Sequence, residues 1–302
     1  MKKLFHFTCL VALIACLTSH AHGRDNLIFT RAFADNEYGT YEVAVLKAAL
    51  KATQEYGEIS LSPHPNPMSQ SRQLFTLLNG DADVMWSVTD RSREQKLLPI
   101  RLPLLKGYAG YRVFIINPAR QNDFSQISDV HTLKSMSLVQ GADWPDLAVL
   151  KSNGFDVFSE DWSLWFHSMY SMVDKQLVDG FPRNIIEVHR DMARHPDKKV
   201  AIEKRHLLSY PNYEFFFVHP DNIALANRLR VGLIRLLESG ELASLFNQFE
   251  WHKTASEIAN SPDRVVHTLR NPSIPYTLSY AQWDKYTKAA IHALKQELET
   301  NP

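Results

Sequence analysis

The feature that most constrains this chain is an alternation between residues 27 and 86. Short apolar runs at 27–30, 59–61 and 82–86 are separated by two segments, 41–56 and 69–78, whose apolar residues recur at helical spacing. Strands that alternate with helices in this way form a parallel sheet covered by helices. The sequence therefore predicts an α/β fold, in which ligands bind beyond the carboxyl ends of the strands.

The alternation resumes after an apolar, β-branched run at 111–116. We expect further strands at 137–139, 155–158 and 215–218, and helices at 144–152, 164–175, 184–194, 222–237, 242–249 and 280–298. A chain of 302 residues has room for two domains or lobes.

A cluster of polar residues follows the apolar run at 82–86, where an α/β fold would bind a ligand. It contains Ser87, Thr89, Arg91 and Arg93. The planar guanidinium of an arginine can meet a carboxylate with two charge-assisted hydrogen bonds. One of the two arginines would hold a ligand and the other would be solvated, and the residues alone leave open which one. Trp86 could stack on a ligand or fill the core, and we favour the core.

Three stretches of the chain are similar to parts of a known family. LLNGDADVMWSVTDRSRE at 77–94 matches a turn, a strand and a Thr-x-x-Arg pattern, with one extra residue before Arg93. ISDVHTLKSMSLVQGAD at 127–143 matches the entry into a second lobe, and NRLRVGLIRLLESGELASLFNQF at 227–249 matches a closing helix pair. In this order they resemble the type II periplasmic solute-binding proteins, in particular extracellular solute-binding protein family 3, which often binds amino acids. The resemblance covers about 27–250 and leaves the tail, 252–302, outside.

The resemblance implies two lobes, each a small, mainly parallel sheet flanked by helices. The first lobe would combine 24–112 with 217–302, and the second would be 113–216, with hinge crossings near 111–113 and 214–217. A small ligand would bind between the lobes and draw them together.

The resemblance also implies which residues of the first lobe bind the ligand. Arg93 would hold its carboxylate, although the extra residue keeps Arg91 in competition. Ser87 and Thr89 would add hydrogen bonds.

Two other segments of the first lobe could reach the ligand. Gln70 and Arg72 begin a helix whose N-terminus should face the cleft, although Arg72 could also be a solvated helix residue. Asp35, Glu37 and Tyr38 follow the first strand and could close the rim, but a solvated loop is favoured.

In the second lobe, Asp143-Trp144-Pro145 opens a helix after a strand. A helix N-terminus suits an anion because it presents free N–H groups and the positive end of a dipole. Proline suits the first helical turn. Asp143 could equally be only the N-cap of this helix.

Arg183 departs from the pattern of the family, which in its amino-acid binders usually has an aspartate near this position to pair with the ligand's ammonium. If Arg183 faces the cleft, the ligand is predicted to be an anion without a free amine. The alternative is an ion pair with Glu187, four residues later on the same face of the expected helix.

The N-terminus predicts export. Lys2 and Lys3 precede an apolar region at 4–17, and small residues near 19–23 offer cleavage sites, so 1–23 reads as a signal peptide. Both cysteines, Cys9 and Cys16, lie inside it, which leaves no disulfide in the mature chain. Lipidation at Cys16 is a less favoured alternative to cleavage. The expected location is the periplasm.

Several classes of function are disfavoured. The formal net charge is zero and no basic block occurs, so no nucleic-acid partner is expected. No HExxH, CxxC, GxSxG, Walker or GxGxxG motif is present, so we expect no metal and no cofactor.

These patterns predict a monomeric binding protein that delivers a small polar anion, bearing a carboxylate or similar group, to a membrane permease of an ABC transporter. One alternative is a ligand-sensing partner of a membrane receptor, because the fold serves both uses. Another is a dehydratase-like enzyme, since a few relatives of this fold dehydrate small acids. That enzyme would need Glu187 or Asp143 as general acid or base.

Overall fold

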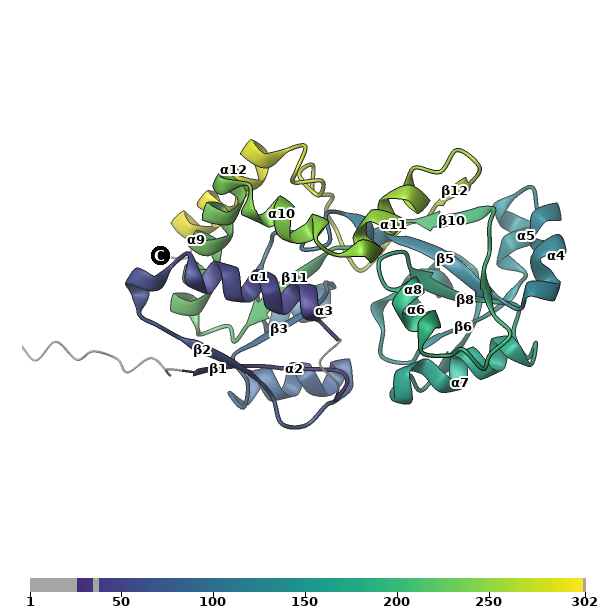
Figure 1. Ribbon diagram of the computed structural model, residues 1–302, viewed down its shortest axis with the longest axis horizontal. Coiled ribbons are helices and arrows are strands. Elements are labelled where there is room, and N and C mark those ends of the chain that lie inside the picture. The colour runs from purple at the N-terminus through teal and green to yellow at the C-terminus, as the bar shows by residue number, and fades with distance from the viewer. Residues whose placement is uncertain (1–25, 35–37, 301–302) are drawn as a thin grey trace, which may run out of the picture.

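A computed structural model of the protein describes residues 26–34 and 38–300 (Figure 1). The predicted signal peptide, with Cys9 and Cys16, lies outside the described residues, as do Asp35 and Glu37. The strands are β1 (Asn26–Phe29), β2 (Ser60–Pro63), β3 (Val84–Val88), β4 (Leu98–Ile100), β5 (Tyr111–Ile116), β6 (Ser137–Gly141), β7 (Asp156–Glu160), β8 (Phe181–Asn184), β9 (Ala201–Ile202), β10 (His206–Ser209), β11 (Glu214–Val218) and β12 (Val265–Thr268). The α-helices are α1 (Thr40–Lys51), α2 (Gln70–Leu78), α3 (Arg91–Lys96), α4 (Gln121–Gln126), α5 (Val130–Lys134), α6 (Pro145–Ser152), α7 (Ser163–Asp174), α8 (Val188–Ala193), α9 (Ile223–Ser239), α10 (Glu241–Asn247), α11 (Glu250–Ala259) and α12 (Thr287–Thr300).

The first sheet has the strand order β2-β1-β3-β11-β4. Strand β1 is parallel to both β2 and β3, as the β-α-β-α-β pattern predicts. Strand β11 returns from the second lobe and is antiparallel to β3 and β4. Helix α9 packs closely on α1: a Cβ atom on Gly232 would lie 2.4 Å from the carbonyl oxygen of Ala49. Glycine at this position therefore permits the close approach of the two helices.

The second sheet has the order β12-β10-β5-β8, with β9 also paired to β5 and the parallel pair β6-β7 beside β8. The strands of this lobe are mixed in direction. Strand β12 is parallel to β10 and β6 is parallel to β7, whereas β5 is antiparallel to β8, β9 and β10. Strand β5 carries the chain into this lobe and β10 carries it out, so the two strands run in opposite directions.

The expected helix at 184–194 is shorter and begins later. Its first residue, Asn184, ends strand β8, which pairs with β5, and residues 185–187 form a turn. Only Val188–Ala193 is helical. Arg183 and Glu187 therefore do not share a helix face, although they still form an ion pair.

Two crossings join the sheets, at 101–110 and 210–213, between β4 and β5 and between β10 and β11. They run side by side: the backbone N–H of Tyr210 donates to the carbonyl of Gly110 at 3.0 Å. A Cβ atom on Gly110 would lie 2.2 Å from the carbonyl oxygen of Tyr210, which explains the glycine. Both crossings end just before the residues where we expected them.

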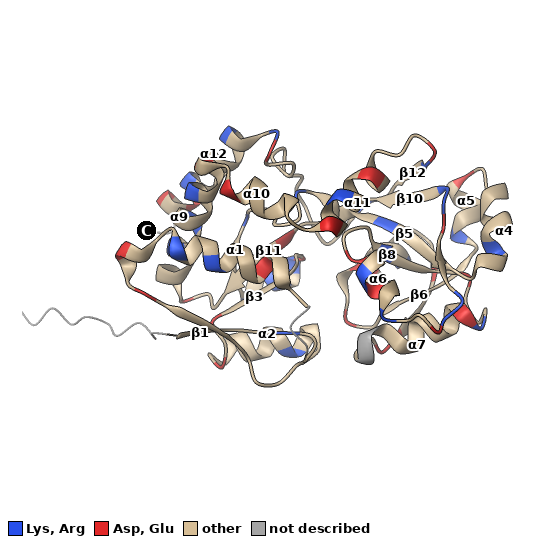
Figure 2. Ribbon diagram, in the orientation of Figure 1, with Lys and Arg blue, Asp and Glu red and all other residues tan. Residues whose placement is uncertain are grey.

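The tail differs from the prediction that 217–302 belongs to the first lobe. Strand β12 pairs in parallel with β10 on the second sheet, whereas α12 packs on α9 in the first lobe (Figure 1). Lysine, arginine, aspartate and glutamate are interspersed over both lobes (Figure 2). None of the helices in the described residues is both long and apolar enough to span a membrane.

Candidate ligand site between the lobes

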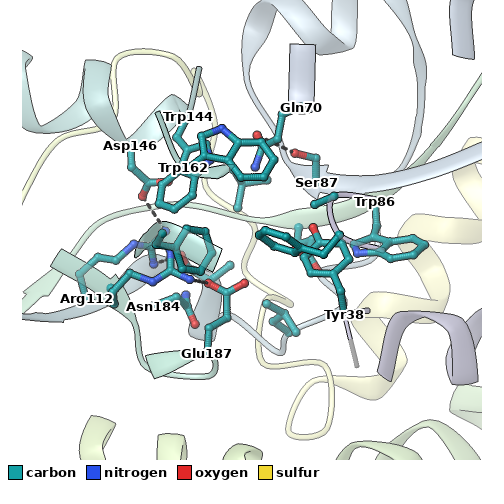
Figure 3. Close-up of a pocket in the computed structure, with 18 residues that line it drawn as sticks. Tyr38, Gln70, Trp86, Ser87, Arg112, Trp144, Asp146, Trp162, Asn184 and Glu187 are labelled. Carbon is teal, nitrogen blue, oxygen red and sulfur yellow. Dashed lines mark hydrogen bonds and ion pairs between the residues drawn. The ribbon is translucent and has the colours of Figure 1, made fainter. Parts of the chain in front are cut away.

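A cavity of about 70 Å³ lies between the two lobes (Figure 3). The first lobe and the crossings contribute Ala32, Phe33, Tyr38, Gln70, Trp86, Ser87, Val88, Leu105, Ala109 and Glu214 to its lining. The second lobe contributes Arg112, Trp144, Asp146, Trp162, Phe166, Arg183, Asn184 and Glu187. Because both lobes supply side chains, closing or opening the lobes would change the shape of this cavity.

Aromatic rings from both lobes meet around the cavity. Phe33 of the first lobe makes edge contacts with Trp162 and Phe166 of the second, with ring centroids 5.6 Å apart in each case. Tyr38 stacks on Trp86, with centroids 6.1 Å apart. Trp86 is 5% exposed, which confirms the favoured core role, and it also lines the cavity.

Arg183 faces the cavity, but its charge is already paired. Its guanidinium forms a short ion pair with Asp191 and a second one, at 3.0 Å, with Glu187. It also lies over the rings of Trp144 and Phe166, at 4.9 and 4.4 Å from their centroids. Burial alone would lower the pKa of Arg183, but Asp191 and Glu187 together raise it above its ordinary value. The predicted ion pair with Glu187 is confirmed, and it coexists with the position in the cavity.

Arg112 lines the cavity and is absent from the sequence-based set of site residues. Its Nη2 donates to Oδ1 of Asp146 at 2.6 Å, and Asp146 also accepts a short hydrogen bond from Tyr210. Burial would lower the pKa of Arg112, but the nearby Asp146 carboxylate outweighs it and raises that pKa. An arginine inside the otherwise apolar run at 111–116 was the signal that could have identified it.

Two of the predicted ligand-binding residues, Ser87 and Gln70, line the cavity, whereas Arg93 does not. The Arg93 guanidinium donates to the carbonyl of Val88 at 2.6 Å and to Oε1 of Gln70 at 2.8 Å. Its burial lowers its pKa. Arg93 thus holds Val88 and Gln70, two residues of the cavity wall, without lining the cavity itself.

The other polar residues of this cluster point elsewhere. Thr89 is buried and its hydroxyl donates to Glu94 at 2.6 Å. The side chains of Arg91 and Arg72 are exposed. None of the three lines the cavity, because α3 begins at Arg91 and turns the chain away from the carboxyl end of β3.

Asp143 does not cap its own helix. Its Oδ2 accepts a hydrogen bond at 3.0 Å from the backbone N–H of Ser71, in the first turn of α2 across the interface. Its Oδ1 accepts from the indole N–H of Trp162 at 2.6 Å. Trp144, the next residue, lines the cavity, and among the described residues its buried Nε1 has no hydrogen-bond partner.

A second, smaller cavity of about 20 Å³ adjoins the first and shares Tyr38, Trp86 and Glu214 with it. The carboxyl groups of Glu42 of α1 and Glu214 of β11 both line it and interact with each other. Burial, followed by the proximity of Glu42 and Glu187, raises the pKa of Glu214 well above its ordinary 4.5. This environment favours the neutral, protonated form of Glu214 over its carboxylate.

No group of histidine, cysteine or carboxylate side chains that could hold a metal ion occurs at 26–34 or 38–300. The predicted rim residue Tyr38 lines the cavity, and burial raises the pKa of its hydroxyl above 10, so it is present as the neutral phenol.

No family model and no curated protein matches the sequence. Solved structures do match the fold. An ancestral arginine-binding protein bound to arginine has a TM-score of 0.58 at 15% identity and covers 76% of this chain and 100% of its own. A periplasmic binding protein with high arginine specificity from Salmonella typhimurium has a TM-score of 0.55 at 17% identity, with 74% and 98% covered.

A histidine kinase sensor domain with similarity to periplasmic binding proteins is also similar to this chain. Its TM-score is 0.56 at 11% identity, and it covers 75% of this chain and 96% of its own. These likenesses and the two sheets described above establish that the chain has the two-lobed α/β fold of the type II periplasmic solute-binding proteins.

Proposed function

We propose that this protein is an exported solute-binding protein that encloses a small ligand between its lobes. The observation that carries the proposal is the cavity whose wall is shared by both lobes, from Phe33 and Gln70 on one side to Trp144 and Arg183 on the other. Ligand sites are typically concave, mostly apolar and equipped with a few polar groups that fix orientation.

The lining favours a ligand with zero net charge and an acceptor oxygen. Arg112 is paired with Asp146, Arg183 is paired with Asp191 and Glu187, and burial raises the pKa of Glu214, which favours its neutral form. The unpaired, buried N–H of Trp144 costs free energy that a ligand oxygen, such as that of a carboxylate, would offset. Because the charge of Arg183 is already paired with carboxylates, the reason for excluding a ligand amine no longer applies.

A thermal-shift screen of the purified protein tests this proposal. Its arms are zwitterionic amino acids, uncharged polar compounds, monocarboxylate and dicarboxylate anions, phosphorylated compounds and oligopeptides. We expect stabilisation by a compound from one of the first two arms. Stabilisation by anions alone would instead support the anionic ligand predicted from the sequence, and no stabilisation by any arm would contradict the proposed function.

A matched pair of variants locates the binding. Ala32 lines the cavity, so Ala32→Phe should fill it and abolish the thermal shift. Ala119 is exposed, so Ala119→Phe should leave the shift unchanged. Equal shifts in the two variants would place the ligand elsewhere.

We propose that the protein binds its ligand without turnover. Asp143 uses both carboxylate oxygens in hydrogen bonds and Glu187 is paired with Arg183, so neither is placed as a free general acid or base. Product formation from a small hydroxy acid would overturn this point.

The likeness to a sensor domain supports a second role, in which a membrane receptor binds the ligand-bound form of the protein. Uptake of the radiolabelled screening hit by cells lacking this gene distinguishes the two roles. Lost uptake supports delivery to a permease, and unchanged uptake with a lost cellular response supports sensing.

A further inference from the structure

The C-terminal part of the chain makes two further crossings between the lobes, in addition to those at 101–110 and 210–213. After α10 the chain leaves the first lobe, forms α11 between the lobes and adds β12 to the second sheet (Figure 1). It then returns to the first lobe and ends in α12. We call residues 250–283 the strap.

The strap is attached to the second lobe through its backbone. The N–H groups of Val265 and Leu269 donate to the carbonyls of Arg205 and Ser209 at 2.7 and 2.8 Å. The side chain of Leu269 is 5% exposed and packs in the core cluster that contains Leu208 and Tyr210. Removing β12 would therefore break ladder hydrogen bonds and expose apolar surface.

Side chains add to this attachment. Nη1 of Arg264 donates to the carbonyls of Glu203 and His206 at 2.9 and 3.1 Å. The buried rings of His206 and His267 share a hydrogen bond between ring nitrogens 2.9 Å apart. The second lobe thus holds the strap along the whole length of β12.

The returning part of the strap lies directly on the hinge crossing 210–213. Nδ2 of Asn271 donates to the carbonyl of Pro211 at 2.9 Å. The ring of Tyr276 stacks on that of Tyr213, with centroids 6.1 Å apart and planes within 8° of parallel. The N–H of Leu278 donates to the hydroxyl of Tyr213 at 3.0 Å.

The strap is also anchored on the first lobe. The indole N–H of Trp283, a fully buried side chain, donates to the carbonyl of Pro103 at 2.7 Å. Pro103 lies in the other hinge crossing, 101–110, so the strap contacts both crossings. Lys106 of the same crossing pairs with Asp284 at 2.5 Å.

We propose that the strap is a hinge restraint that limits how far the two lobes can open. Hinge motion is absorbed by backbone rotation in a few connecting residues. Here the connecting residues at 210–213 are covered by a segment fixed to both lobes, so wide opening must either peel β12 from β10 or break the contacts with Tyr213. The restraint is independent of which ligand is bound.

Pulsed electron paramagnetic resonance tests the proposal on the whole chain. Spin labels at Lys51→Cys, on α1, and Lys151→Cys, on α6, report the distance between the lobes when Cys9 and Cys16 are changed to serine. The strap is released by Leu269→Asp, which buries a charge against the second sheet. Val266→Asp is the matched control on β12, three residues before Leu269, because Val266 is 50% exposed.

We expect the distance distribution of Leu269→Asp to broaden and shift to longer distances, and that of Val266→Asp to match the parent protein. Asn271→Ala, which removes the bond to Pro211 without placing a charge in the core, should shift the distribution in the same direction. If circular dichroism shows that Leu269→Asp is unfolded, the distance distribution of Asn271→Ala tests the restraint instead. A folded release variant with the parent distribution would overturn the proposal.

Discussion

Arg183 is buried in the second lobe with two carboxylate partners of different exposure. The side chain of Asp191 is fully buried, whereas that of Glu187 is 30% exposed. Removing one partner of a buried ion pair leaves an uncompensated charge and costs about 3–5 kcal/mol. An ion pair with solvent access contributes about 1 kcal/mol or less.

Asp191→Asn should therefore lower the free energy of unfolding by about 3 kcal/mol, measured by urea titration. Glu187→Gln is the control and should cost about 1 kcal/mol or less. Equal losses in the two variants would show that burial does not make the Asp191 pair more important than the Glu187 pair.

The carboxyl pair of Glu42 and Glu214 predicts a pH dependence. Arg190 of α8 and Glu187, which directly precedes that helix, also line this small cavity, together with Tyr41 and His252. Because the folded protein raises the pKa of Glu214 above 4.5, the stabilising contribution of its protonated form is present below pH 4.5. That contribution is lost as the pH rises through the folded-state pKa, with a slope of at most about 1.4 kcal/mol per pH unit for one proton.

Glu214→Gln places a neutral group of the same shape at this position at every pH. The variant should therefore not lose stability as the pH rises. We expect its melting temperature to exceed that of the parent protein by an amount that increases from pH 5 to pH 8. A constant difference across this range would show that Glu214 titrates normally.

At the scale of elements, the contact between α1 and α9 reverses the usual effect of a glycine substitution. Replacing a helical glycine by alanine normally stabilises a helix by about 0.5–1 kcal/mol. At Gly232 the new Cβ atom would lie 2.4 Å from a backbone oxygen of α1, so the helices must separate.

Overpacking of this kind costs about 1–3 kcal/mol. Gly232→Ala should therefore lower the urea midpoint, while Glu238→Ala, at an exposed position of the same helix, should change stability by less than about 0.5 kcal/mol. A rise in the midpoint of Gly232→Ala would mean that α1 and α9 can move apart without cost.

Local patterns predicted the elements better than the site. The alternation at 27–86 predicted three strands and two helices correctly, because their periodicity depends only on near neighbours. The periodicity of the later part of the chain did not predict α11 or β12. Strand β12 is a strand only through its pairing with β10, some 60 residues earlier.

The site residues show the same limit. Five of the predicted ligand-binding residues line the cavity, namely Ser87, Gln70, Tyr38, Trp144 and Arg183. Arg93 was chosen by resemblance and lies behind the wall. Which way an arginine points depends on acceptors such as Gln70, whose position comes from the tertiary structure.

At the scale of the whole molecule, the lobes are held together by a polar contact as well as by aromatic rings. Asp143 of the second lobe accepts the hydrogen bond of Ser71 N–H at the start of α2, in the first lobe. This resembles an N-cap, which contributes about 1 kcal/mol, except that its two halves lie on different lobes. Opening the lobes must break it, so the bond biases the equilibrium toward the closed form.

Asp143→Ala should raise the ratio of open to closed molecules about fivefold, because about 1 kcal/mol corresponds to that factor. The radius of gyration from small-angle X-ray scattering should then exceed that of the parent protein. Asp129→Ala is the matched control, since Asp129 accepts from the N–H of Thr132 at 2.9 Å at the start of α5, within one lobe. It should reduce stability without changing the radius of gyration. If both variants have the parent value, the Asp143 bond does not hold the lobes together.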